Sequence, residues 1–147
     1  MVVVLKSGGV DINEADAASH IFGYAAGCDL TRRDHQAKAK ETGSPWDSAK
    51  GFDHSAPIGA IARAEDCPSL MEATLKTVVN DSVRQSAPLS SMIWSIPEII
   101  ARLSQLFELK AGDLIFTGTP EGVGPLVVGD RTEITIGDLP VLSFLME

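Results

Sequence analysis

The chain has 147 residues, the length of a single domain, and 44% of them are hydrophobic, an ordinary fraction for a globular protein. Its 20 acidic and 12 basic residues give a net charge of -8 without basic runs, which argues against nucleic-acid and membrane-surface partners. Only two cysteines, without CxxC spacing, and the lack of a long apolar segment or leader-like start predict a reduced, cytoplasmic protein.

The first third of the chain is predicted to alternate short strands and helices. Residues 2–5 are β-branched or apolar throughout, which indicates a strand buried on both faces. Asn13 can cap a short helix whose first turn is acidic. Further along, we expect a strand at 22–29, a helix at 32–40 and a loop at 41–52.

The remaining elements are carried by a hairpin and one amphipathic helix. Asn80-Asp81-Ser82 separates two strand-like runs, 75–79 and 83–85, as a hairpin turn does. Ser95 and Glu98 have the spacing of a capping box, and an apolar face follows them. The other expected elements are a short strand at 56–61, an irregular connection at 62–71, and strands at 113–117, 132–136 and 141–145.

The predicted fold class is α+β and strand-dominated, with a mixed sheet in one domain over residues 1–147. Strands outnumber helices, and they lack the regular alternation of βαβ units. No internal repeat or linker divides the chain.

The segment from Asp113 to Gly124 is the most informative part of the sequence. Its apolar start predicts a buried strand that runs into a turn containing Gly118, Gly122 and Gly124. Hydroxyl groups of Thr117 and Thr119 and backbone N–H groups in such a turn can bind an anion. The alternative is a tight turn that only connects two strands.

Four ordered motifs resemble the fumarylacetoacetate hydrolase family, with the match extending to about residue 139. They are residues 23–36, 46–53 and 92–98 and the Thr-Gly-Thr-Pro-Glu-Gly turn at 117–122. Residues 6–11 and the Thr-Arg-Arg-Asp variant at 31–34 are most similar to fumarylpyruvate hydrolases and related acylpyruvases. The resemblance implies a rolled β-sandwich, a homodimer, and C–C bond hydrolysis of an acylpyruvate in aromatic catabolism.

The resemblance implies one ligand for a divalent ion in this chain. Asp29 matches the family aspartate that binds Mg²⁺, for which Mn²⁺ or Ca²⁺ are alternatives, and hard ions prefer such oxygen ligands. Cys28 stands where the family often has Asn. The alternative role for Asp29 is to cap the following helix.

The other implied site residues are catalytic or substrate-binding. Lys50 matches the lysine that stabilises an oxyanion, and Arg33 helps to hold the site. Gln36 matches a residue that hydrogen-bonds the small, anionic oxo-acid substrate, while Gly118 and Thr119 match the turn that binds its carboxylate. The three histidines lack the spacing of a metal site and have no nucleophile motif beside them.

Family members usually carry an N-terminal portion that has no counterpart in this sequence. It supplies a Glu-x-Glu pair of metal ligands and a lid helix with a His and a Glu. We therefore expect this chain to be the C-terminal part of a catalytic domain, to bind the ion weakly or not at all, and to expose residues 2–5 as a sheet edge. Two alternatives stay open: a non-catalytic homologue, and a decarboxylase or isomerase that uses the same residues.

Overall fold

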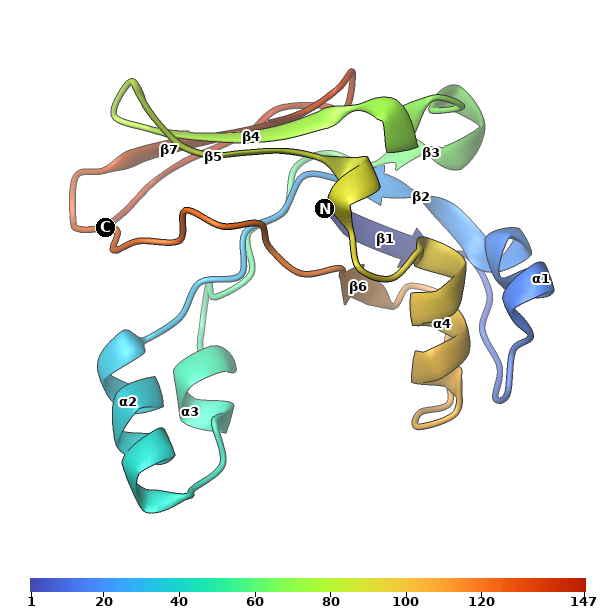
Figure 1. The fold of residues 1–147 in the computed structure, drawn as a ribbon, viewed down its shortest axis with the longest axis horizontal. Coiled ribbons are helices and arrows are strands. Elements are labelled where there is room, and N and C mark those ends of the chain that lie inside the picture. The colour runs from blue at the N-terminus through green and yellow to red at the C-terminus, as the bar shows by residue number, and fades with distance from the viewer.

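Two four-stranded sheets form the framework of the computed structural model, which describes residues 1–147 (Figure 1). The first sheet has the order β3-β2-β1-β6, with β1 Val2–Leu5, β2 Ile21–Ala25, β3 Ala62–Arg63 and β6 Leu114–Phe116. The second has the order β5-β4-β7-β8, with β4 Thr74–Val79, β5 Ser82–Pro88, β7 Arg131–Ile136 and β8 Leu142–Leu145. This confirms the strand-dominated fold class, although every strand pair is antiparallel rather than mixed.

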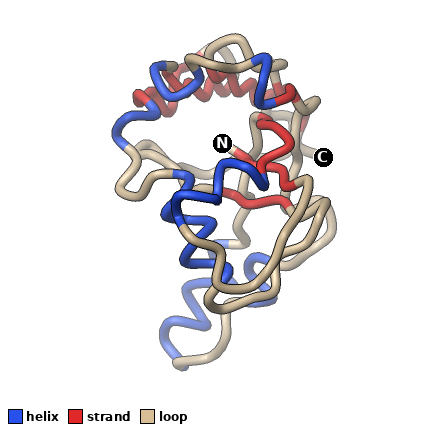
Figure 2. The backbone as a smooth tube through the Cα atoms, turned by 90° about the vertical axis from the view of Figure 1, so that its right-hand side faces the viewer, coloured by secondary structure: helices blue, strands red, loops and turns tan.

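The helices are short. The α-helices are α1 Glu14–Ala17, α2 Arg33–Thr42, α3 Asp47–Lys50 and α4 Ile96–Ser104, and the 3₁₀ turns are η1 Ala18–His20, η2 Ala64–Asp66, η3 Leu70–Glu72 and η4 Leu89–Ser91. Figure 1 shows α2 and α3 next to each other and away from both sheets. The same helices lie below the strands in the perpendicular view of Figure 2. None of the helices is long and apolar enough to cross a lipid bilayer.

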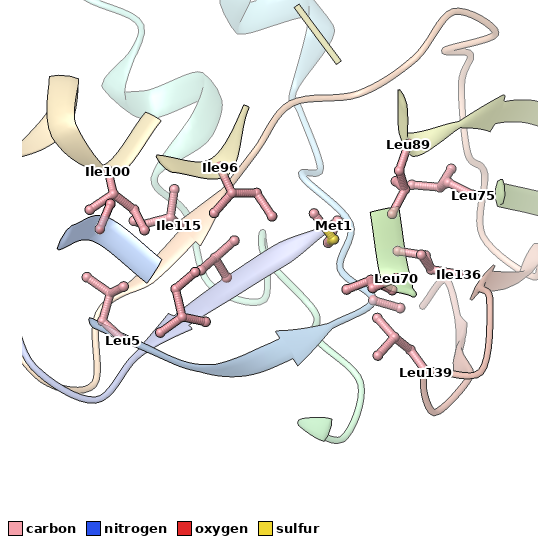
Figure 3. Packing of buried hydrophobic residues seen from close by; sticks show 14 of the residues in the cluster. Met1, Leu5, Leu70, Leu75, Leu89, Ile96, Ile100, Ile115, Ile136 and Leu139 are labelled. Atoms are coloured by element: carbon pink, nitrogen blue, oxygen red, sulfur yellow. The ribbon is translucent and has the colours of Figure 1, made fainter. Parts of the chain in front are cut away.

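Strand β1 is the centre of the first sheet, and all four of its residues are buried, as its composition predicts. It pairs with β2 on one side and β6 on the other, so residues 2–5 do not form an exposed edge and that expectation was wrong. Figure 3 shows Ile96 and Ile100 of α4 beside Leu5 and Ile115. Met1 connects this group to the apolar residues of the second sheet.

The β4–β5 hairpin forms where the sequence predicts it. Asn80 and Asp81 have φ angles of 47° and 66°, the left-handed conformation that two-residue hairpin turns require. The residues of β4 alternate, so that Leu75, Thr77 and Val79 face inward. The pairing register shifts between Thr77 and Val78, which marks a β-bulge in the partner strand.

Several local predictions differ from the structure, among them the strand expected at 22–29, which ends at Ala25. Residues 41–52 contain helix α3 rather than a loop alone, and residues 56–61 form an isolated bridge between Gly27 and Ile58 instead of a strand. The segment 62–71, expected to be irregular, contains β3 and two 3₁₀ turns. Asn13 precedes α1 as expected, but its side chain makes no capping hydrogen bond.

Helix α4 begins with the predicted capping box. The backbone N–H of Glu98 donates to Ser95 Oγ at 3.3 Å, and the backbone N–H of Ser95 donates to Glu98 Oε2 at 2.7 Å. These bonds satisfy donors that the first helical turn leaves without partners. The N–H of Ser95, followed by its hydroxyl, lowers the pKa of Glu98.

We expect Ser95→Ala to lower the free energy of unfolding by about 1 kcal/mol, the usual loss for a Ser cap. For a domain of this size the melting temperature should fall by about 3 °C, measured by circular dichroism. Ser90→Ala is the matched control, because Ser90 is exposed and lies outside any such bond. Equal shifts in the two variants would contradict the role of the cap.

The stabilisation by Glu98 should depend on pH. Because the folded pKa is lowered, this contribution is present above the ordinary carboxyl value of 4.5 and is lost as the pH falls through the folded pKa. The stability difference between the wild type and Glu98→Gln, measured by urea unfolding, should therefore shrink in acid. A difference that grows below pH 4 would show that another group is responsible.

Candidate active site

The two halves of the candidate site meet because β2 and β6 flank the same strand. Val2 pairs with Ala25 of β2 and with Phe116 of β6, both in antiparallel register. The C-terminal ends of β2 and β6 therefore lie at the same end of the sheet, on either side of the start of β1. The residues that follow, 27–29 and 117–119, leave the sheet at this shared end.

A close backbone approach at Gly27 lets the chain leave β2 in the required direction. A Cβ atom at this position would lie 2.4 Å from Val2 Cγ2 and 3.1 Å from Phe116 Cε1. Only glycine allows this path across the first sheet without displacing its side chains. The path leads directly to Cys28 and Asp29.

Residues 26–32 and 49–59 run side by side as a neck between the first sheet and the α2–α3 arm (Figure 1). The backbone N–H groups of Cys28, Leu30 and Arg32 donate to carbonyl oxygens across this neck at 2.8 to 3.0 Å. The Arg32 guanidinium carbon also lies 4.3 Å from the centre of the Phe52 ring, an attractive cation–π geometry. The neck thus fixes the end of α3 against the segment that follows β2.

The neck brings together the two most important predicted residues. Lys50 Nζ donates to Asp29 Oδ2 at 2.6 Å, across 21 residues of sequence. Both side chains remain partly exposed, at 37% for Lys50 and 56% for Asp29, so they are accessible from solvent. Their contact places a positive charge and a carboxylate at one point of the surface.

A cavity of about 540 Å³ lies at this point, a volume typical of small-molecule sites. Its wall includes the predicted residues Asp29, Arg33, Lys50, Gly118 and Thr119. Four basic and two acidic side chains line it, in a chain whose net charge is -8; they are Arg32, Arg33, Lys50 and Arg84, and Asp29 and Asp34. This local positive charge favours a small anion.

Gln36 is the predicted site residue that does not line this cavity. Its side chain is buried in α2, with 8% of the residue exposed, and Oε1 accepts a hydrogen bond from Arg33 Nη1 at 2.9 Å. The predicted shared helix face of Arg33 and Gln36 is therefore present. In this structure Gln36 orients an arginine of the cavity wall.

The glycine-rich turn after β6 is held against the β-bulge of β5. Gly122 has a φ of +92°, and a Cβ atom there would lie 2.0 Å from the carbonyl oxygen of Arg84. Gln85, the next residue, donates from Nε2 to Thr119 Oγ1 at 2.8 Å and to the Pro120 carbonyl at 3.0 Å. Neither β5 residue belongs to a motif, and counting strand positions from the Asn80-Asp81 turn without the bulge would place Arg84 rather than Gln85 opposite Thr77.

Cys28 lines the cavity next to Asp29, and its surroundings favour the protonated thiol. Burial raises the pKa of its thiol, and the Asp29 carboxylate raises it further, whereas Lys50 and the terminal amino group act in the opposite direction. The thiol is therefore protonated at neutral pH, and the thiolate is the reactive form.

The donors in the cavity suit a hard divalent ion in kind but not in number. Asp29 offers carboxylate oxygens, which such ions prefer, but Oδ2 is already engaged with Lys50. Nowhere in the chain do three His, Cys, Asp or Glu side chains gather as a metal-binding group. These residues alone do not complete the ligand set of a divalent ion.

A second, mostly apolar cavity of about 480 Å³ adjoins the first. Trp94 forms part of its wall, while Trp46 stands outside both cavities beside Lys40. The two cavities share Met1, Leu75, Gly118, Thr119 and Pro120. None of the three histidines lines either cavity.

Residues 1–144 match the protein family described as fumarylacetoacetate (FAA) hydrolase C-terminal. The match extends over nearly the whole chain, and the chain belongs to this family. Both the predicted resemblance and the predicted type of fold are confirmed.

Three relatives illustrate the similarity. The chain is 42% identical over 142 residues to oxaloacetate tautomerase FAHD1, mitochondrial, of Mus musculus, covering 97% of this chain and 64% of that protein. It is 39% identical over 131 residues to fumarylpyruvate hydrolase of a Ralstonia species, covering 89% of this chain and 68% of that protein. The crystal structure of fumarylpyruvate hydrolase from Pseudomonas aeruginosa in complex with Mn²⁺ and pyruvate superposes with a TM-score of 0.95 at 42% identity, covering 99% of this chain and 62% of that one.

The chain therefore spans between 62% and 68% of the length of these three relatives. Their names describe two reactions, a tautomerisation and a hydrolysis. Membership of the family alone does not select between the two.

We expect Gly122→Ala to destabilise the fold more than Gly112→Ala. The two glycines have φ angles of +92° and +91°, but a Cβ atom on Gly112 would meet nothing within 4 Å. Gly112→Ala should lower the free energy of unfolding by about 1 kcal/mol, through conformational strain alone. Gly122→Ala should lower it by roughly 1–3 kcal/mol more, because the added Cβ atom also collides with the backbone. Equal losses in urea unfolding would show that the turn does not pack on Arg84 in solution.

We expect the 147-residue chain to bind Mg²⁺ and Mn²⁺ with dissociation constants above the micromolar range. A hard ion is strongly hydrated, and binding to a single carboxylate does not compensate for the loss of its water ligands. Calorimetric titration measures this, with Asp53→Ala as a control outside the cavity wall. Micromolar affinity that disappears in Asp29→Ala but persists in Asp53→Ala would contradict the expectation.

Proposed function

We propose that this chain carries the substrate-binding and oxyanion-stabilising residues of a hydrolase that cleaves a C–C bond in acylpyruvates such as fumarylpyruvate. The observation that carries the proposal is the convergence of Lys50, Asp29 and Thr119 on one positively charged cavity. A small, dianionic oxo acid has the size and charge that this cavity favours.

Each cavity residue then has a role in the reaction. Water adds to the distal carbonyl carbon of the acylpyruvate, and Lys50 stabilises the negative charge that develops on the oxygen. The C–C bond breaks, its electron pair remains on pyruvate as an enolate, and a proton completes pyruvate. Gly118 and Thr119 bind the substrate carboxylate, while Gln36 orients Arg33 at the cavity wall.

A divalent ion, Mg²⁺ or Mn²⁺, is part of the proposal as an additional positive charge near Asp29. The Mn²⁺ complex of the Pseudomonas relative supports this. None of the roles given to Lys50, Thr119 or Arg33 passes through the ion. A homodimer and a cytoplasmic location complete the proposal, although the mouse relative is named as mitochondrial.

A second candidate function is tautomerisation or another isomerisation of a 2-oxo acid, or its decarboxylation. The relative named oxaloacetate tautomerase supports it, because that protein is as similar to this chain as the hydrolases are. A third is a homologue that folds but does not catalyse. Lys50 and Thr119 would face the substrate in both catalytic cases.

We expect slow hydrolysis of fumarylpyruvate by the 147-residue chain with excess Mg²⁺, at least ~100-fold below an intact relative assayed beside it. General acid–base assistance contributes about 10² to 10⁴ in rate, and no histidine lines the cavity to provide it. Lys50→Ala should abolish the remaining turnover, and Lys38→Ala, on the exposed surface of α2, should not.

The products distinguish the candidate functions. Release of fumarate and pyruvate supports hydrolysis, whereas Lys50-dependent conversion of oxaloacetate between enol and keto forms supports tautomerisation. Turnover at the rate of the intact relative would show that groups not recognised in this cavity supply the missing assistance. Failure with every oxo acid supports the non-catalytic homologue.

A further inference from the structure

We propose that Gln85 is a positioning residue that sets the direction in which the Thr119 hydroxyl donates its hydrogen bond. The inference rests on the proposed role of Thr119 in binding the substrate carboxylate. It adds a residue from the second sheet to a site built by the first sheet and its neck.

The β-bulge in β5 delivers Gln85 to this position. Lys76 pairs with Ser86 and Thr77 with Gln85, but Val78 pairs with Val83, so Arg84 is the additional residue. Bulges redirect side chains and are frequent beside active sites. Here both Arg84 and Gln85 line the charged cavity, whereas Ser86 does not.

The hydrogen bonds of Gln85 fix which end of its amide faces the turn. Nε2 lies 3.0 Å from the carbonyl oxygen of Pro120, which can only accept. The opposite amide orientation would place two oxygens against each other. The nitrogen must therefore face the turn, and its second hydrogen is directed to Thr119 Oγ1 at 2.8 Å.

This arrangement makes Thr119 a donor toward the cavity. Because Oγ1 accepts a hydrogen bond from Gln85, the hydroxyl hydrogen must point elsewhere, and both Gly118 and Thr119 border the cavity. A carboxylate only accepts hydrogen bonds, and bonds to a charged acceptor are stronger than neutral ones. Gln85 thereby orients the hydroxyl for an anion before the anion arrives.

The backbone of the same bulge holds the turn that carries Thr119. The carbonyl of Arg84 occupies the place of a side chain on Gly122, and Gln85 Cγ would lie 3.3 Å from the same Cβ position. The side chain and the backbone of adjacent β5 residues thus restrain both ends of the segment 119–122. The restraint needs neither a metal ion nor substrate.

The hydrogen bond can be tested without substrate. In ¹⁵N-resolved spectra of the full chain, Thr119→Val should move one of the two Gln85 Nε2 proton signals toward free-amide values and speed its exchange with water. The control Ser86→Ala should leave both signals in place, because Ser86 lies outside the cavity wall. Gln85 signals that are insensitive to Thr119→Val would overturn the inference.

The consequence for binding is tested with pyruvate as the probe, in the presence of Mn²⁺. We expect Gln85→Ala to weaken pyruvate binding about tenfold, and Gln85→Glu to weaken it further because a carboxylate would take up the hydroxyl hydrogen. In the Thr119→Val background the same changes should have less than a twofold effect, since no hydroxyl remains to be oriented. Melting temperatures separate this effect from general loss of structure.

The outcomes separate the inference from the proposed function. Equal losses with and without Thr119 would overturn the positioning role while the proposed function stands. A wild-type chain that binds no pyruvate, but whose Gln85 signals respond to Thr119→Val, would overturn the proposed carboxylate site and leave the hydrogen-bond geometry established.

Discussion

The antiparallel pairing of β1 with both β2 and β6 is the constraint on which the candidate site depends. Two strands that run antiparallel to a common neighbour must end on the same side, so Ala25 and Phe116 lie on either side of Val2. Asp29 and Thr119, 90 residues apart in sequence, follow from these strand ends. The buried, apolar character of β1 stabilises this arrangement, because apolar burial is the dominant favourable contribution to folding.

The charged groups at this place contribute little to the stability of the fold. The Lys50–Asp29 pair is short, but both side chains are more than a third exposed, and exposed ion pairs typically contribute little to the free energy of unfolding. The neck hydrogen bonds hold the backbone on both sides of the pair independently of it. Under the proposed function, Lys50 can therefore interact with a bound anion without loss of the fold.

Sequence patterns predicted the helices and turns that neighbouring residues determine. They missed the features that depend on residues far away in the chain. The capping box at Ser95 and the hairpin turn at Asn80 rest on neighbouring residues, and both formed as expected. The short helix α3 exists beside the neck, whose backbone bonds join residues more than 15 positions apart. The edge expected at residues 2–5 was wrong because the partner strand β6 lies more than 100 residues away.

The site residues likewise include some that motifs predict and others that depend on distant parts of the chain. The motifs located Asp29, Lys50 and Thr119, which line the cavity, whereas Gln36 lies outside the cavity wall with its amide turned to Arg33. Gln85 belongs to none of the four motifs. Its place follows from a one-residue register shift, a property of the pairing between two strands rather than of either strand alone.

The two reactions named among the relatives have one chemical requirement in common. Oxaloacetate and fumarylpyruvate each carry a carboxylate next to a 2-oxo group and an acidic carbon beside it, so a tautomerase and a hydrolase both stabilise an enolate of the same head. Under the proposed function, a turn that binds the carboxylate serves this part of the substrate equally in either reaction. This common requirement makes the similarity of the chain to both kinds of relative expected. The two reactions differ in what happens at the distal carbon.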